Sequence, residues 1–461
     1  MNRHCAFLAT LLLSAACTQT PPPTLPATDI PAAFEQAVPP GVTAWPAADW
    51  WKGFGDNQLD ALMESAQASN LDIAQAQARM RQADARARQA GAALLPTLGL
   101  NATVDSLYGQ SGSTSLHETD YSAGLGASYE LDFWGKNRAA ASSAESARAA
   151  SAADRATVAL TVTGSVANSY FLLLSLRERI AVTEANLKSS QEILSVVQRR
   201  VDAGYSPAAD LLQERANMAM QRSLLPALQQ QELETRDALA ILTGHPPEGF
   251  SVIATSLNGV TIPMVAPGLP SGLLTRRPDI AAAEANLAAA HADLAVARAA
   301  FLPNITLNAT AGLQYPALAA AVDTLPGVGF GASLGAALVQ SIFDGGRNAA
   351  KTAEAKAREE ELLAAYRAAA MNAFADVENA LGSLNHLTQQ EGALRDQVTQ
   401  AEKVLGAARR KYTSGYADFL TITDAERSLY TARDQLSDVR RAKLSASVAL
   451  IKALGGGFQT P

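Results

Sequence analysis

Apolar and polar residues alternate with a period of two in four segments of this chain. The segments cover about residues 97–108, 122–133, 304–315 and 328–342. In each of them one set of alternate positions is apolar and the other is small or polar. Strands of about ten residues with these two faces are typical of a transmembrane β-barrel. The alternative is a set of soluble hairpins that bury one face.

Two long proline-free segments indicate helices instead. Residues 137–203 and 347–413 are rich in Ala, Arg, Glu, Gln and Leu, which are strong helix formers. At 1.5 Å per residue each helix would be about 100 Å long. No single globular domain accommodates that length, so we expect the helices to pack side by side. Each is followed by a Gly-Tyr turn, at Gly204 and Gly415, and then by a returning helix.

This order of elements occurs twice along the chain. Asp72-Ile73-Ala74 returns as Asp279-Ile280-Ala281, and the other matching pairs lie about 207–211 residues apart. Each copy contains a helix, two strands, a long helix, a turn and a returning helix. The chain is therefore predicted to consist of a first copy, an equatorial linker rich in Pro and Gly, a second copy and a C-terminal tail, at residues 50–244, 245–277, 278–455 and 456–461.

The number of strands sets a lower limit on the number of chains. Four strands cannot close a barrel, and two chains would supply an eight-stranded barrel whose interior is filled by side chains. A conducting tube therefore needs at least a trimer, with twelve strands. After the leader, no apolar run is long enough for a transmembrane helix. We expect any crossing of a membrane to use the strands.

The first residues indicate export. Arg3 precedes an apolar stretch over residues 6–16, which is typical of a signal peptide covering 1–16. The residues before Cys17 resemble a bacterial lipoprotein box, in which the cysteine is lipidated, although Ser14 stands where that box usually has Leu. An ordinary cleaved signal peptide is the alternative. A covalent lipid on Cys17 is the only attached group we expect, with no cofactor.

The residues after the leader indicate the location of the protein, and the overall charge excludes one class of partner. Thr18 follows Cys17 in place of the Asp that retains lipoproteins at the inner membrane, which favours the outer membrane. Residues 17–49 are rich in proline and are predicted to form a tether. The net charge of −7 and the lack of a basic stripe argue against nucleic acid as a partner. Cys5 is lost with the leader, so no intrachain disulfide is expected.

Sequence motifs for catalysis are weak. Residues 331–335 match the G-x-S-x-G pattern, but Ser333 lies within a continuous alternation instead of a strand–turn–helix. The histidines that follow the leader, at positions 117, 245, 291 and 386, have no metal-ligand spacing, and no phosphate loop is present. We therefore expect no enzyme activity and no metal, and any energy for transport would have to be supplied elsewhere.

Five segments carry a resemblance to a known family: Trp50–Asp56 with Asn70–Ile73, Arg276–Ile280, Phe343–Gly346, Asp424–Tyr430 and Ala453–Gly457. They are similar to the signature segments of the outer membrane factor family, the TolC/OprM-like efflux channels of the NodT type. The resemblance implies an α+β membrane protein: a homotrimeric, 12-stranded outer-membrane β-barrel continued by a long periplasmic α-helical barrel. It also implies a periplasmic adaptor (membrane fusion) protein and an inner-membrane pump, of the RND type, as partners.

The implied function is a passive exit duct for small molecules such as drugs or other toxic compounds. Two alternatives remain open. One is the exit duct of a type I protein secretion system, and the other is a structural periplasmic lipoprotein without a pore.

The resemblance also implies a gate at the periplasmic tip. Family members with a lipid anchor narrow the tip with a leucine and, four residues later, an aspartate, and Leu420 and Asp424 have this spacing. Three copies would bring these side chains together as an apolar constriction and a ring of carboxylates that repel one another. Tyr412 fits the tyrosine of a Tyr–Arg contact, but Ala417 stands where the arginine is expected. The alternative is that Leu420 packs in a coiled coil and Asp424 is solvated.

Overall fold

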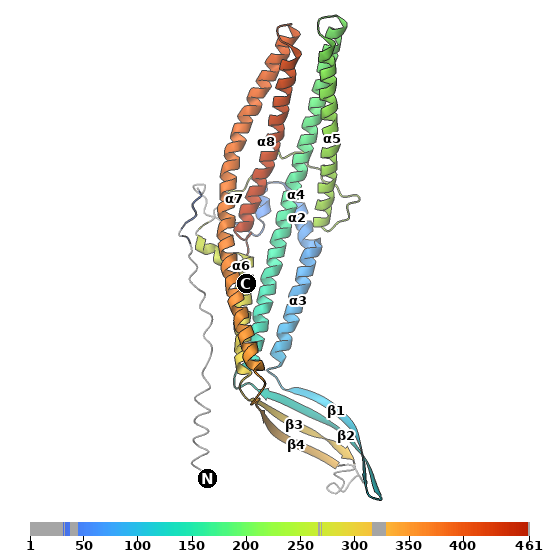
Figure 1. Ribbon diagram of the computed structural model, residues 1–461, viewed down its shortest axis with the longest axis vertical. Coiled ribbons are helices and arrows are strands. Elements are labelled where there is room, and N and C mark those ends of the chain that lie inside the picture. The colour runs from blue at the N-terminus through green and yellow to red at the C-terminus, as the bar shows by residue number, and fades with distance from the viewer. Residues whose placement is uncertain are drawn as a thin grey trace. The chain divides into compact units, whose positions relative to one another are not determined.

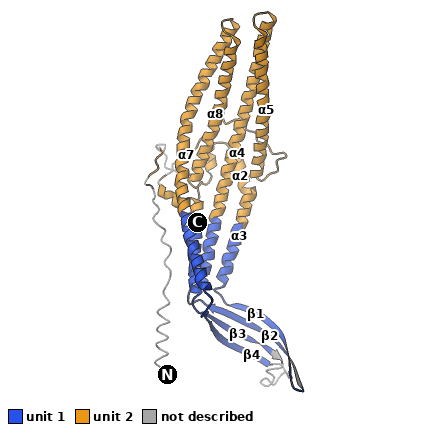
Figure 2. Ribbon diagram, in the orientation of Figure 1, with its two compact units in different colours: residues 1–26, 79–152, 282–366 blue, residues 27–78, 153–281, 367–461 orange. Residues whose placement is uncertain are grey.

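A computed structural model describes residues 31, 33–36, 45–265, 268, 270–315 and 329–459. The predicted signal peptide, Cys17 and most of the predicted tether lie outside these residues. The chain divides into two compact units (Figure 2). The first contains residues 79–152 and 282–366, and the second contains residues 153–281 and 367–461 together with an N-terminal segment up to residue 78.

The first unit holds a four-stranded antiparallel sheet, formed by β1 (Thr97–Ser111), β2 (Thr114–Leu131), β3 (Asn304–Tyr315) and β4 (Gly329–Val339). The strands follow the chain order β1-β2-β3-β4 (Figure 1), so the two copies meet where β2 pairs with β3. Gly124 faces Gly312 at this junction, and a Cβ on Gly124 would lie 2.8 Å from the carbonyl oxygen of Ala311. Glycine is therefore required for the two copies to pair at this register.

The strands confirm the period-two alternation, with shifted ends. β2 begins earlier than predicted, because its pairing with β1 continues to Ser111↔Thr114 at a turn where Gly112 has a positive φ. β4 ends at Val339, and the chain then turns through Gly345 and Gly346, both with positive φ. Ser333 lies within β4, and its hydroxyl shares a hydrogen bond of 2.7 Å with the Thr310 hydroxyl.

Both copies use the same device to begin a long helix after a strand. α4 (Lys136–Asp202) and α7 (Arg347–Thr413) are each 67 residues long, as predicted. The carboxylate of Asp132 accepts from the backbone N–H groups of Asn137 and Arg138, and Asp344 accepts from those of Gly346 and Asn348. A carboxylate here satisfies free N–H groups and is favoured by the helix dipole. The shorter helices α3 (Leu71–Ala92) and α6 (Pro278–Ala299) precede the strand pairs β1-β2 and β3-β4.

In the second unit, α4 and α7 continue and return as α5 (Ala208–Leu242) and α8 (Phe419–Ala453), giving two helical hairpins (Figure 1). Their main core also includes the short helices η1 (Trp50–Phe54), α2 (Asn57–Ser69) and η2 (Pro270–Thr275). Phe54 packs against Phe171 of α4 with ring centroids 5.2 Å apart. Tyr170 donates a 2.7 Å hydrogen bond to Asp56, whose other carboxylate oxygen caps α2.

The expectation that no apolar run is long enough to span a membrane was wrong for α4. This helix contains an 18-residue window that is apolar enough by composition, and half of the window is buried. The reason is the core just described, because α4 supplies Val162, Val166, Tyr170, Phe171 and Leu174 to it. The apolar run is therefore accounted for by packing inside the second unit.

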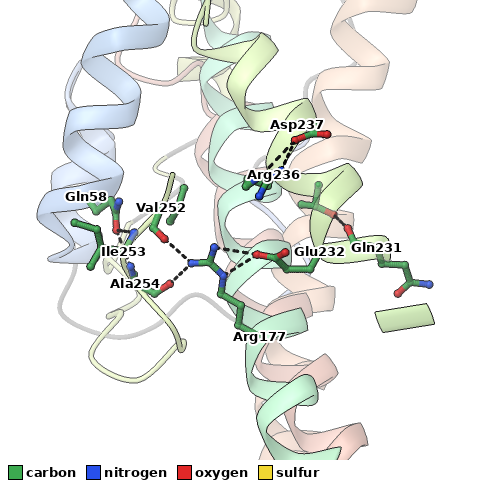
Figure 3. A network of polar contacts seen from close by, with 10 residues as sticks. Gln58, Arg177, Gln231, Glu232, Arg236, Asp237, Val252, Ile253 and Ala254 are labelled. Atoms are coloured by element: carbon green, nitrogen blue, oxygen red, sulfur yellow. Dashed lines mark hydrogen bonds and ion pairs between the residues drawn. The ribbon is translucent and has the colours of Figure 1, made fainter. Parts of the chain in front are cut away.

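Arg177 is one of the residues that hold the linker between the copies (Figure 3). Arg177 of α4 pairs with Glu232 of α5 at 2.9 Å and donates to the carbonyl oxygens of Val252 and Ala254 at 2.7 and 2.6 Å. Gln58 of α2 accepts from the backbone N–H groups of Ile253 and Ala254, at 3.1 and 2.8 Å. These contacts tie an irregular segment to three helices.

Candidate gate at the turns of the helical hairpins

The two hairpins end in the same backbone turn. Gly204 and Gly415 have φ of +76° and +83°, which favours glycine. Tyr205 donates from its backbone N–H to the carbonyl of Arg200 at 2.8 Å, and Tyr416 donates likewise to Lys411 at 2.9 Å. This 6→1 bond closes a Schellman motif in both copies. Both tyrosine side chains are exposed.

The helices pack beneath these turns around a second apolar cluster, separate from the main core. It joins residues of all four hairpin helices, so it holds the two hairpins together at this end. The buried members are Ile193, Val197, Leu211, Leu405, Ala408, Tyr412, Phe419, Ile422, Ala425 and Leu429.

The second turn differs from the first in how the returning helix begins. Asp418 caps α8 by accepting from the backbone N–H and the hydroxyl of Thr421, at 3.1 and 2.8 Å. The bond from the Thr421 hydroxyl holds the pKa of Asp418 below its usual value. Pro207 precedes α5 at the same place in the first copy and offers no side-chain cap.

Leu420 and Asp424 lie on an exposed side of α8, directly after the second turn. Leu420 is 61% exposed, and Asp424 is exposed with no ion pair among the residues that the structure describes. Residues four apart on a helix lie on the same face. The structure therefore brings these two predicted gate residues together on a face that the single chain leaves uncovered.

Tyr412 lies apart from that face. Its side chain is 2% exposed within the second cluster, and its ring packs against Phe419 with centroids 6.0 Å apart. The guanidinium of Arg200 lies 4.6 Å from the ring centroid, and its Nη1 donates to the Tyr412 carbonyl oxygen at 2.6 Å. An arginine of α4 thus contacts this tyrosine, whereas Ala417 cannot.

Sequence reasoning missed Arg200 because it searched for the arginine in the second copy. The contact crosses the two copies, from the end of one long helix to the end of the other. Lys411 accepts the same turn hydrogen bond in the second copy that Arg200 accepts in the first. Both long helices therefore carry a basic residue at this position before the turn. That pairing of basic residues was the available signal.

A second cross-hairpin contact lies deeper. Arg409 of α7 donates to Glu426 of α8 at 3.0 Å and also to the hydroxyl of Ser189 on α4. Burial raises the pKa of Glu426, and Arg409 offsets part of this rise. No group of three or more potential metal ligands occurs within the described residues. The tip therefore consists of packing, cation–π and ionic contacts between helices.

Comparisons with known proteins agree over nearly the whole chain. The model of the outer membrane efflux protein family matches residues 62–245 and again 269–456. Pyoverdine export outer membrane protein OpmQ of Pseudomonas putida is 41% identical over 100% of this chain and 98% of its own length. Cation efflux system protein CusC of Escherichia coli is 31% identical over 98% of both. The crystal structure of the outer membrane protein VceC of Vibrio cholerae superposes with a TM-score of 0.83, at 30% identity, over 90% of this chain and 100% of that chain.

Proposed function

Because this chain belongs to the outer membrane efflux protein family and is an outer-membrane channel component of tripartite efflux, we propose that three identical copies form its duct. Each copy contributes four strands to one barrel and two helical hairpins to one periplasmic tube. The tube conducts passively and closes at the hairpin turns. The observation that carries the association of copies is the pair of free edges on the sheet, and the width that a lumen needs sets their number at three.

The sheet edges require a partner chain. In the order β1-β2-β3-β4, strands β1 and β4 are each paired on one side. Unpaired backbone groups are costly in a bilayer, so strands that span one form closed barrels. Pairing β4 of one copy with β1 of the next satisfies both edges, and three copies complete a twelve-stranded barrel. Large apolar side chains at Leu98, Leu100, Leu334 and Leu338 are exposed, as contact with lipid requires.

The partners follow from the family. We propose that a periplasmic adaptor protein and an inner-membrane pump of the RND type load the duct. No nucleotide-binding motif occurs in the sequence, so the energy for export has to come from such a pump. A lipid on Cys17, which becomes the first residue once residues 1–16 are removed, would anchor the chain to the outer membrane. Intact-mass measurement of the purified protein tests this lipid.

For the cargo, we propose small molecules. The relative OpmQ, 41% identical over the whole chain, is named for pyoverdine export, and CusC, 31% identical, for cation efflux. The higher identity favours an organic cargo similar to pyoverdine over a metal cation. Deletion of this gene would then lower the amount of such a compound in the culture medium. An unchanged amount, with a loss of resistance to metal cations, would favour the cation instead.

Two measurements test the duct itself. The purified protein should run as a trimer that dissociates on heating, and it should form ion-conducting channels in planar bilayers. A soluble rod that never conducts would support a structural lipoprotein and would overturn the proposal. Restored secretion of a large protein substrate, with no effect on small molecules, would support a type I secretion duct.

A further inference from the structure

A buried carboxyl group lies between the two hairpins, below the turns. Glu214 of α5 is 0% exposed, and neither of its carboxyl oxygens has a hydrogen-bond partner of normal geometry. Unpaired buried carboxylates are strongly disfavoured, and such groups usually take up a proton. Glu214 is a carboxyl group with both oxygens buried and unpaired, and such a group needs an explanation.

The groups that shift the pKa of Glu214 include no basic side chain. A neighbouring cavity is lined by Asn186, Ser189 and Ser190 of α4, which do not titrate, and by Glu426, Arg427 and Tyr430 of α8. Arg409 of α7 is engaged by Glu426 of α8. The charge that acts on Glu214 is thus another carboxylate, on the opposite hairpin.

This small cavity of about 50 Å³ lies between the hairpins. It is lined by residues of all four helices, including Glu426. Several polar atoms around it are buried without a partner, including Nδ2 of Asn186 and Oε1 of Gln221. A cavity of this size has room for water. The interface between the hairpins is therefore polar here and lies next to the apolar cluster under the turns.

We propose that Glu214 is a proton-operated lock between the two helical hairpins: when protonated it lets them pack together, and when ionised it drives them apart. The lock needs no new ligand. The ionised carboxylate of Glu214 is repelled by Glu426 and is more stable in water, so its ionisation favours separation of the hairpins. This inference rests on the proposed function, since it places the lock at the closed end of the duct.

The pKa of Glu214 sets the direction of the effect. Burial, and next the charge of Glu426, raise this pKa from 4.5 to about 7, while Asn217 and Ser190 offset part of the rise. Once the hairpins part, contact with water returns the pKa of Glu214 towards 4.5. Between these values the packed state binds more protons than the parted state. Lowering the pH from about 7 towards 4.5 thus favours packing, by up to about tenfold per pH unit.

The test is a pH titration of single-channel recordings with the full-length trimer. The fraction of time in the open state should fall several-fold between pH 7.5 and pH 5.5. Glu214→Gln should stay mostly closed at both pH values, because its amide cannot ionise. Glu234→Gln is the matched control, since Glu234 is exposed on the same helix and bonded to Gln230. It should titrate like the unmodified protein.

Two further variants separate the sources of the pH dependence. Asp424→Asn should keep the titration, whereas Glu426→Gln should move its midpoint to lower pH by removing the repelling charge. The inference is overturned if the unmodified trimer shows no pH dependence, if Glu214→Gln still titrates, or if Asp424→Asn abolishes the effect.

Infrared spectroscopy gives a readout that does not need a conducting channel. A protonated-carboxyl band should disappear between about pH 6 and pH 8 in the unmodified protein and should be absent in Glu214→Gln. No such band would overturn the lock even if the channel conducts. A band without any conductance at any pH would support the buried proton while overturning the proposed duct.

Discussion

At the scale of single residues, the side chains predicted for the gate differ in exposure. Leu420 and Asp424 are exposed on α8, and Tyr412 is buried beneath Arg200. A single exposed leucine is ordinary on a protein surface. Three of them around an axis would narrow a tube, and three carboxylates one turn away would repel. The buried pair instead holds the two hairpins of one chain together.

The exposed pair leads to a test of the constriction. Asp424→Ala should raise the single-channel conductance of the isolated trimer, and combining it with Leu420→Ala should raise it further, because both changes widen the tip. Asp438→Ala is the control, since Asp438 lies on the same helix in a surface ion pair with Arg441. If the double variant conducts like the unmodified channel, the constriction lies elsewhere.

The buried pair leads to a second test. Arg200→Ala removes a charged hydrogen bond and a cation–π contact, which together contribute about 2–3 kcal/mol. The tip should loosen, so conductance should rise and the hairpin ends should exchange amide hydrogens faster. Arg199→Ala, the exposed neighbour on α4, should leave both unchanged. Equal effects from the two variants would count against the Arg200–Tyr412 contact as a latch.

At the scale of elements, the hairpins are held together by contacts at two levels. The second apolar cluster joins them beneath the turns, and the main core joins them around η1 and α2. The irregular linker belongs to the main core, to which it contributes Val252, Leu257 and Val265. Arg177 adds polar contacts to its backbone, and loss of that side chain leaves two carbonyl oxygens without this donor.

Arg177→Ala should therefore destabilise the linker more than the helices. The loss of an ion pair and two hydrogen bonds to carbonyls is expected to cost about 2–4 kcal/mol. Limited proteolysis should then cut within residues 245–265 at lower protease concentration. Arg236→Ala is the matched control, because Arg236 pairs with the adjacent Asp237 alone in this network (Figure 3). Equal cleavage of both variants would remove Arg177 as the anchor.

At the scale of the whole molecule, the sheet is incomplete and its apolar face is uncovered. Leu334 of β4 is 83% exposed, while its neighbour Ser333 faces the opposite side and bonds to Thr310. In a barrel one of these faces meets lipid and the other meets the lumen.

Substitution of an arginine on one face of the sheet or on the other distinguishes the two environments. Leu334→Arg should hinder insertion by about 2–4 kcal/mol, because the charge enters lipid. The yield of heat-dissociable trimer in liposomes should fall accordingly. Ser333→Arg should assemble normally and reduce conductance, because its charge enters the lumen. Normal assembly of Leu334→Arg would contradict this orientation of the strands.

The sequence by itself determined the elements and their order. Alternation and helix-forming composition are local properties, so the two helices of 67 residues were predicted within one residue, and the strands were found with shifted ends, most of all β2, which begins at Thr114 instead of about residue 122. The duplication also predicted that both hairpins would end in the same turn. The residues named for the gate, Leu420, Asp424 and Tyr412, came from resemblance to a family, and their role remains a prediction, as does the lipid on Cys17.

Only the tertiary structure decided which side chains meet between the hairpins. Arg200 reaches Tyr412, and the charge of Glu426 acts on Glu214, across more than two hundred residues of sequence. These contacts depend on the rotation and register of one long helix against another. A helix pattern that is rich in alanine and weakly amphipathic leaves both open, because many rotations bury similar apolar area. Tertiary packing selects one of them, and that choice turns an ordinary glutamate into a buried acid.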